Sequence, residues 1–214
     1  MRKELLKKFI PPILISLYRR LRFPDKNPNI LFDGDDTLFK ELTRSAQTYG
    51  EYGCGKSTKW VVNNTSAKVI AVDTSEEWVD VVRADNSEDT DRLNIQHVDL
   101  GDLGAWGRPI DYGKRASFSD YTDHLWNQDT KPDVVLVDGR FRVCCFLTSL
   151  KFAAEGTQIL FDDYTNRPHY HVVEKYAARE RECGRQCLFV VPEKSKLDFD
   201  ELEKDITAFR HVMD

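Results

Sequence analysis

Short apolar runs alternate with helix-like stretches along residues 68–192, and this alternation restricts the fold more than any other feature of the chain. The runs are rich in Val, Ile, Leu and Phe, and each has the length of a buried strand. Strands that alternate with helices predict βαβ units and a parallel sheet of the α/β class. Right-handed crossovers place the carboxyl ends of such strands at one edge of the sheet, where ligands bind.

The same pattern predicts the individual elements. The predicted strands are residues 68–73, 94–100, 132–138, 156–164 and 186–192. The predicted helices are residues 74–83, 142–153, 170–180 and 198–212. Thr74 and Glu77 have the spacing of a capping box at a helix start. Residues 101–128 form a polar stretch with several aromatic side chains, too long for an ordinary connection, which predicts an insertion on the substrate side.

The N-terminal segment, residues 1–29, differs from the rest of the chain. Residues 1–23 carry seven Lys/Arg and one acid, whereas the whole chain has a net charge of −5. Its apolar centre is too short to span a bilayer, and a Pro/Asn-rich linker follows it. We predict a basic amphipathic helix that binds a membrane surface or a partner such as a glycosyltransferase. The alternative is a helix packed on the single domain predicted for residues 30–214.

Overall charge and cysteine use exclude several classes of protein. The net charge of −5 argues against a nucleic-acid binder, whose surface is basic. The five cysteines contain no C-x-x-C pair, and their odd number fits a reducing cytoplasm. We therefore expect a cytoplasmic protein, peripheral to a membrane if residues 1–23 bind one. Composition does not decide between a monomer and a homo-oligomer.

The segment TYGEYGCGKST, residues 48–58, fits two different nucleotide-binding loops. The pattern Gly50-x-x-x-x-Gly55-Lys56-Ser57 matches the phosphate-binding loop of ATPases and GTPases. Such a loop follows a continuous buried strand, but the residues before Gly50 are mostly polar. A nucleotide phosphohydrolase or kinase that uses Gly50 to Ser57 therefore stays as the alternative hypothesis.

The second pattern in this segment is Glu51-x-Gly53-x-Gly55, followed by a helix that opens at Ser57. Glycines let the backbone approach a ligand closely, and a helix N-terminus favours negative charge. Asp73 ends the next predicted strand, where dinucleotide-type folds place the acid that binds ribose hydroxyls. A glycine turn, a helix, a strand and a terminal acid in this succession predict a nucleotide-cofactor site.

Four segments, EYGCGKST, VIAVDTSEEW, VVLVDGRFR and ILFDDY, resemble the motif series of class I S-adenosylmethionine-dependent methyltransferases. The chain most resembles the small type found with polysaccharide-biosynthesis enzymes and, more distantly, macrocin-type sugar O-methyltransferases. The resemblance covers roughly residues 31–192. It implies a Rossmann-like, mostly parallel seven-stranded sheet with helices on both faces and one reversed strand.

The resemblance also implies a site for S-adenosylmethionine. The implied cofactor-binding residues are Glu51, Gly53, Gly55 and Ser57 at the glycine turn, Asp73 and Thr74 after the second strand, and Asp99 after the third. The first group would surround the methionine part, Asp73 the ribose and Asp99 the adenine. Many family members carry a third glycine where this chain has Lys56 and Ser57.

A second set of acids follows two later strands. Asp138 ends VVLVD, and Asp162 and Asp163 end ILFDD. If these strands are neighbours, three carboxylates meet at the ligand edge, and carboxylate oxygens suit a magnesium ion. In the macrocin type that this cluster resembles, such a metal orients and acidifies a sugar hydroxyl. The alternative is that Asp138 and Asp163 only cap the helices that follow them.

Further polar and aromatic residues lie near these motifs. His169 is a candidate general base beside Asp138, with a surface histidine near a helix start as the alternative. Arg140 and Arg142 could grip an acidic acceptor or make ion pairs. The aromatic residues Trp106, Tyr112, Tyr121 and Trp126 are candidates for a wall against a sugar ring, or for core packing.

Upstream, Asp33-x-Asp35-x-Thr37 resembles the nucleophile motif of haloacid-dehalogenase-type phosphatases, but a solvated acidic turn explains it better. That interpretation leaves the glycine turn and Asp73 unexplained. We therefore predict an S-adenosylmethionine-dependent O-methyltransferase that acts on a sugar or glycan hydroxyl with help from magnesium. Besides the phosphate-loop enzyme, the remaining alternative is a non-catalytic binding subunit with a methyltransferase-like fold.

Overall fold

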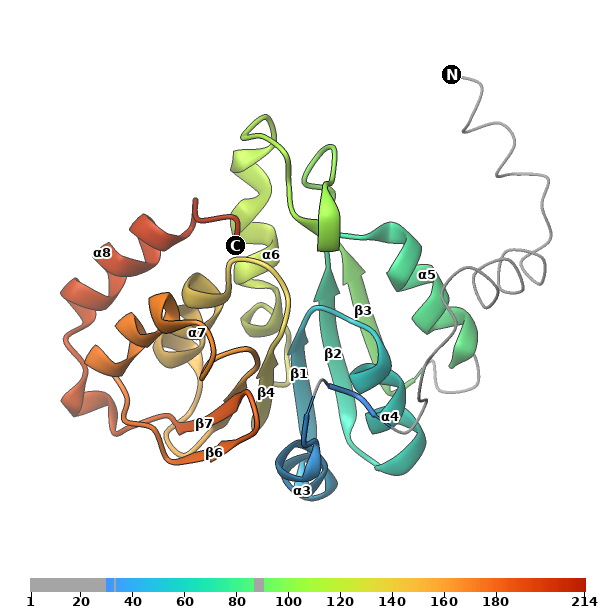
Figure 1. The fold of residues 1–214 in the computed structure, drawn as a ribbon, viewed down its shortest axis with the longest axis horizontal. Helices are drawn as coiled ribbons and strands as arrows, with labels where there is room; N and C mark the ends of the chain where they lie inside the picture. The colour runs from blue at the N-terminus through green and yellow to red at the C-terminus, as the bar shows by residue number, and fades with distance from the viewer. Residues whose placement is uncertain (1–29, 33, 87–90) are drawn as a thin grey trace. The chain divides into compact units, whose positions relative to one another are not determined.

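Seven strands form one sheet in the order β3-β2-β1-β4-β5-β7-β6 in the computed structural model (Figure 1). The structure describes residues 30–32, 34–86 and 91–214, and these ranges contain most of the compact unit Phe32–Asp214. The strands are β1 (Thr48–Tyr52), β2 (Lys68–Asp73), β3 (Leu93–His97), β4 (Val134–Val137), β5 (Gln158–Phe161), β6 (Arg181–Cys183) and β7 (Gln186–Val190). The helix predicted within residues 1–29 lies outside the described residues.

Strand direction confirms the mostly parallel sheet and places the reversed strand. Strands β1 to β5 pair in parallel, whereas β7 runs antiparallel to β5 and to β6. β7 is therefore the single strand that runs against the others. β6 is short and largely exposed, so no hydrophobic pattern predicted it.

Helices cover both faces of the sheet, as the alternation of side chains along β1 shows. Glu51 bonds to the start of α4 and Tyr49 stacks on α3, whereas Tyr52 points the other way and bonds to Thr122 of α6. The α-helices are α3 (Thr37–Ser45), α4 (Lys56–Asn64), α5 (Glu76–Asp85), α6 (Phe118–Thr122), α7 (Arg142–Phe152) and α8 (Phe199–Phe209). α3 contacts α4, α4 contacts α5, and α7 contacts both α6 and α8.

The main core lies on the α7 side of the sheet. Nine successive residues of α7, Arg142 to Leu150, are buried, because α8 and the segment Pro168–Lys175 cover the helix on the side away from the sheet. A helix enclosed on all sides needs apolar or internally bonded side chains around its whole circumference. This explains the run VCCFL, and it makes Cys144 and Cys145 buried free thiols.

Two predicted helix features are wrong in detail. Ser75, not Thr74, caps α5, since its side chain accepts a hydrogen bond from the Trp78 amide. Residues 170–180 do not form an α-helix: Pro168–Lys175 is a 3₁₀ helix, and β6 begins soon after it. Tyr170 and Val173, three residues apart, both face the core, which suits three residues per turn.

The N-terminal acidic motif does not form a phosphatase site in the described part of the chain. Residues 30–32 form no strand, and Asp35 accepts a hydrogen bond from the Thr37 amide at the start of α3. This is the solvated acidic turn of the alternative interpretation. Among the described residues, no helix has the length and apolarity needed to cross a membrane.

Candidate functional site

The glycine turn after β1 lies against the turn after β4. Gly53 has φ of 92°, and a Cβ there would approach the Gly139 Cα to 3.1 Å. A Cβ on Gly139 would approach the Gly53 amide nitrogen to 2.7 Å. The two turns are therefore so close that neither position has room for a side chain. Gly55, at the start of α4, has nothing within 4 Å of an added Cβ. Open space therefore lies over the N-terminus of α4, beside the ends of β1 and β4.

Glu51 holds this turn from inside the protein. Its carboxylate is buried and accepts hydrogen bonds from the Ser57 hydroxyl and, at 2.6 Å, from the Thr58 hydroxyl. Burial raises the pKa of Glu51 to about 8, although the two hydroxyl donors oppose the shift. Glu51 and Ser57 thus bond to each other and fix the start of α4 to β1.

The raised pKa of Glu51 predicts a pH-dependent stability. Between about pH 4.5, where the unfolded chain ionises, and about pH 8, the folded state holds a proton that the unfolded state has lost. The free energy of unfolding of the wild type should therefore fall relative to Glu51→Gln as pH rises through this window, by at most about 1.4 kcal/mol per pH unit. Urea unfolding of both proteins at pH 5 to 9 measures this difference, and parallel curves would contradict it.

Asp73 ends β2 and faces the same turn. Its carboxylate accepts hydrogen bonds from the Cys54 amide at 2.8 Å and from the Ser75 amide at 2.7 Å, one on each oxygen. Burial raises its pKa, while these backbone donors lower it. Each oxygen has further lone pairs, so Asp73 can accept two hydroxyl donors from a ligand.

Two further residues that were predicted to bind the cofactor, Thr74 and Asp99, have partners within the protein. The Thr74 hydroxyl donates to the Gly107 carbonyl at 2.7 Å and joins the 101–128 insertion to the end of β2. Asp99 is exposed and pairs with Lys114 of the insertion, whose hydrogen bond lowers the pKa of Asp99. Both lie at the insertion, and their contact with a cofactor stays a prediction.

The structure does not favour the phosphate-loop alternative. Gly50 lies inside β1, paired with Ile70 and Val135, and a Cβ there would meet the Pro132 side chain at 2.6 Å. The strand continues to Tyr52, so only Gly53 to Gly55 leave it before α4 begins. A phosphate cradle needs the whole span from the first glycine to the lysine as a loop. The lack of space beside Pro132 explains instead why position 50 is a glycine.

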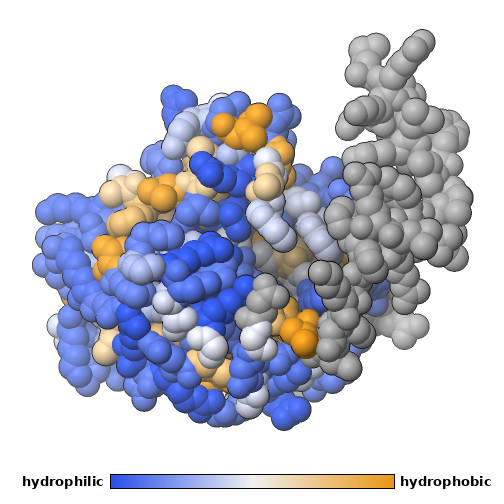
Figure 2. Space-filling model, in the orientation of Figure 1, coloured by the Kyte–Doolittle hydropathy of each residue, from blue (hydrophilic) through white to orange (hydrophobic). Residues whose placement is uncertain are grey.

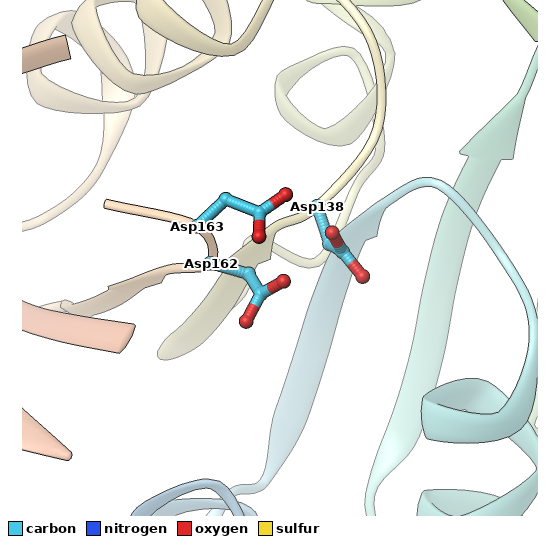
Figure 3. Close-up of side chains that lie close together, drawn as sticks. All are labelled: Asp138, Asp162 and Asp163. Atoms are coloured by element: carbon cyan, nitrogen blue, oxygen red, sulfur yellow. The ribbon is translucent and has the colours of Figure 1, made fainter. Parts of the chain in front are cut away.

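The three later aspartates come together as predicted. β4 and β5 are neighbours, and one carboxylate oxygen from each of Asp138, Asp162 and Asp163 lies within 4.8 Å of the others (Figure 3). Asp163 has φ of 58°, a left-handed conformation that aspartate adopts more readily than most residues. This turn brings two consecutive side chains toward the same cluster.

Three arginines contact these aspartates. Arg185 bonds to both oxygens of Asp162, at 3.2 and 2.6 Å, and to Asp163 at 3.2 Å. Arg142 pairs with Asp138 at 2.9 Å and Asp163 at 3.3 Å, and Arg167 pairs with Asp163 at 2.7 Å. We call Asp138, Asp162, Asp163, Arg142, Arg167 and Arg185 the aspartate–arginine cluster.

Asp138 is the most accessible acid of the cluster. Its side chain is 30% exposed, against 0% for Asp162 and 8% for Asp163. Burial and the neighbouring Asp162 carboxylate raise the pKa of Asp138 to about 7, against the attraction of Arg142. A carboxylate with this pKa can accept a proton near neutral pH.

The two histidines that follow the aspartates in the sequence, His169 and His171, contact other residues. His169 is exposed and packs its ring on Tyr170, with ring centres 4.3 Å apart. The role of His169 as a base stays a prediction. His171 bonds to the Tyr164 carbonyl and to Arg179, and so faces a different group of residues.

The predicted aromatic wall is divided by the fold. Tyr121 and Trp126 are buried in the core, whereas Trp106 is 89% and Tyr112 48% exposed. The buried Tyr121 hydroxyl accepts a hydrogen bond from the Arg140 amide beside Gly139. Only Trp106 and Tyr112 could contact an acceptor with an exposed ring.

Sequence interpretation missed Arg185, Arg167 and Gln186. Gln186 is buried and donates to Asp162 at 3.0 Å. Arg185 directly precedes β7 and Gln186 is its first residue, whereas ligand-edge residues were sought after strands. Because β7 is reversed, its beginning lies at the carboxyl edge of the other strands. Placement of the reversed strand would have revealed both residues.

Comparisons with known proteins found relatives only among solved structures. No family model matches the chain, and no curated protein matches it. A methyltransferase-like protein from Silicibacter pomeroyi is 30% identical, with a TM-score of 0.68, over 79% of this chain and 92% of that one.

Two more distant structures share the fold. A methyltransferase from Geobacter sulfurreducens is 15% identical, with a TM-score of 0.54, over 87% of this chain and 93% of its own. An O-methyltransferase from Bacillus cereus, in complex with S-adenosylhomocysteine, is 16% identical, with a TM-score of 0.51, over 84% of this chain and 97% of its own.

Proposed function

Because the chain belongs to the class I S-adenosylmethionine-dependent methyltransferases, we propose that it methylates a hydroxyl group of a sugar or glycan, with Asp138 as the proton acceptor. The observation that carries this proposal is the position of Asp138. Its partly exposed carboxylate follows β4 directly, next to Gly139, and Gly139 touches the glycine turn at Gly53. A proton acceptor thus adjoins the loop that would hold the methyl donor.

The described residues fit the cofactor. Open space over Gly55 and the N-terminus of α4 suit the carboxylate of a methionine group, and Asp73 can accept both ribose hydroxyls. When bound, S-adenosylmethionine supplies a methyl group on a positively charged sulfur that is already activated for transfer. The task of the chain is then to align the acceptor and remove its proton.

Asp73→Ala is expected to weaken S-adenosylhomocysteine binding by about 1 to 3 kcal/mol, because charged hydrogen bonds to ribose hydroxyls are lost. Lys56→Ala serves as the control and should change this affinity little, since the product has no phosphate. Isothermal titration calorimetry measures both affinities. ATP binding that is lost in Lys56→Ala would instead support the phosphate-loop alternative.

A sugar hydroxyl needs a base because it is a poor nucleophile while it keeps its proton. In the proposed reaction the hydroxyl oxygen forms a bond to the methyl carbon, the bond from that carbon to sulfur breaks, and sulfur keeps the electron pair. The hydroxyl proton passes to the Asp138 carboxylate and then to solvent. Arg142 pairs with Asp138 and fixes the direction of this carboxylate.

A carbohydrate acceptor is supported by the resemblance to polysaccharide-associated enzymes and by the surface of the molecule. The face in Figure 2 is mostly hydrophilic, with separate small apolar areas and not one large patch. The exposed ring of Trp106 could stack on a sugar ring.

Magnesium is not included in this proposal. The three aspartates offer the oxygen ligands that magnesium prefers. Their oxygens, however, accept hydrogen bonds and ion pairs from Arg142, Arg167 and Arg185. As described, the cluster does not fit a divalent cation, so no step depends on one.

The proposal can be tested with a panel of acceptors. The protein is incubated with methyl-labelled S-adenosylmethionine and with monosaccharides, nucleotide sugars or oligosaccharides, and products are separated by mass spectrometry. We expect a mass increase of one methyl group on a carbohydrate hydroxyl. If S-adenosylhomocysteine binds but no panel member is methylated, the non-catalytic binding subunit becomes the better hypothesis.

A further inference from the structure

The aspartate–arginine cluster is balanced in charge without any added ion. Three carboxylates face three guanidinium groups, and each aspartate pairs with at least one arginine at 3.3 Å or less. A divalent cation would bring two further positive charges into this space. Since like charges repel strongly at low dielectric, an ion could enter only if arginine side chains left.

Arg142 cannot leave without loss of other bonds. Its side chain is only 4% exposed, and it donates to the carbonyl groups of Asp162 at 2.7 Å, Gly139 at 3.1 Å and Asp138 at 3.1 Å. Movement of Arg142 would leave these carbonyl groups without that donor. Arg142 therefore belongs to the framework that joins the ends of β4 and β5.

Arg185 covers the acids from the side of the β6–β7 hairpin. It donates one hydrogen bond to each carboxylate oxygen of Asp162. The side-chain amide of Gln186 donates a third, so the Asp162 carboxylate has three donors. The Asp162 side chain is completely buried. A magnesium ion needs nearly octahedral oxygen ligands at 2.0 to 2.1 Å, and Arg185 and Gln186 already take three of the roughly four lone-pair sites of the Asp162 carboxylate.

We propose that Arg142, Arg167 and Arg185 compensate the charge of the three aspartates in place of a divalent cation, and that this chain transfers methyl groups without a metal. The second half of this inference rests on the proposed function. Arg142 and Arg185 are positioning residues: they hold the Asp138 and Asp162 carboxylates and take no proton from the acceptor. The reaction then depends on Asp138 alone for proton removal.

Manganese binding tests the inference without measuring activity. Mn²⁺ is a paramagnetic substitute for magnesium, and its electron paramagnetic resonance signal decreases when it binds to protein. Wild type should leave the Mn²⁺ signal unchanged. Arg185→Met removes one positive charge beside two buried acids, and its Mn²⁺ affinity should exceed that of wild type by about tenfold or more. In Arg185→Lys, which keeps the charge, this gain should be absent.

Arg181→Met is a matched control on the same hairpin. Arg181 makes an exposed ion pair with Glu41, away from the cluster, so its loss should not create Mn²⁺ affinity. S-adenosylhomocysteine binding by each variant shows that it is folded. If Arg185→Met does not fold, titrations of wild type and Asp162→Asn with Mn²⁺ decide the question. Mn²⁺ binding by wild type that disappears in Asp162→Asn would overturn the inference. Absence of Mn²⁺ binding by wild type would support it.

Activity in chelator completes the experiment. Once an acceptor is methylated, the rate in excess EDTA should equal the rate in added magnesium. A rate that falls in EDTA and returns with magnesium would overturn the inference and leave the proposed function intact. Failure to methylate any acceptor, with S-adenosylhomocysteine bound, would count against the proposed function, and the Mn²⁺ titration would still decide the metal question.

Discussion

Replacement of Asp138 by asparagine is expected to slow methyl transfer by about 10² to 10⁴ fold, the usual contribution of a positioned general base. The amide has nearly the shape of the carboxylate but cannot accept the hydroxyl proton. S-adenosylhomocysteine should bind as it does to wild type, because the proposed cofactor contacts come from the glycine turn and Asp73. Single-turnover rates with saturating cofactor, together with calorimetric affinities, measure the two effects separately.

The pH dependence of the rate identifies the base. Only ionised Asp138 can accept a proton, and its pKa is raised to about 7, so the wild-type rate should rise from pH 5 to pH 8 and then level off. Asp138→Asn should lose this rise, whereas Asp129→Asn, at an exposed position in the segment before β4, should keep it. If the rise persists in Asp138→Asn and is lost in His169→Ala, His169 is the base.

Arg142→Met is expected to lower the free energy of unfolding by about 3 to 5 kcal/mol, the usual result when one member of a buried ion pair is removed. Methionine fills similar space but donates no hydrogen bond. The variant leaves three backbone carbonyl groups without the Arg142 donor and removes a positive charge from beside Asp138 and Asp163. Urea unfolding followed by circular dichroism measures the loss.

Arg181→Met again provides the comparison, because its ion pair with Glu41 is exposed and should contribute at most about 1 kcal/mol. Arg142→Lys keeps the charge but not the planar group that reaches several acceptors. Its loss in the free energy of unfolding should therefore lie between those of Arg142→Met and Arg181→Met. A loss below about 1 kcal/mol for Arg142→Met would show that water replaces its hydrogen bonds, contrary to the framework role.

Local sequence was sufficient to predict the cofactor half of the fold. The turn after β1, the helix α4, the strand β2 and Asp73 follow one another along the chain, so each could be placed from its neighbours. The meeting of Asp138 and Asp162 was predicted on the condition that their strands are neighbours, and β4 and β5 meet that condition. In these cases the elements that form the contacts are also close to one another in the sequence.

Features that depend on distant pairing could not be predicted. Arg185 reaches Asp162 only because β7 returns beside β5 in the opposite direction, and no local pattern indicates that return. β6 has three residues and little burial, so it lacks the alternation that predicts a strand. The 3₁₀ conformation of residues 168–175 depends on packing against α7, which local preference does not determine.

The residues at the carboxyl edge of the parallel strands come from two kinds of element, because β7 is reversed. The glycine turn and Asp73 belong to strands that run parallel through the buried core, where an insertion would disturb the crossovers. Arg185 belongs to a surface hairpin, which can change length or residues with little effect on those strands. Evolution can therefore alter the β6–β7 hairpin, on the side where we propose that the acceptor binds, while the proposed cofactor side stays constant. Among relatives of this chain, substitutions and insertions should accumulate in that hairpin before they reach β1 or β2.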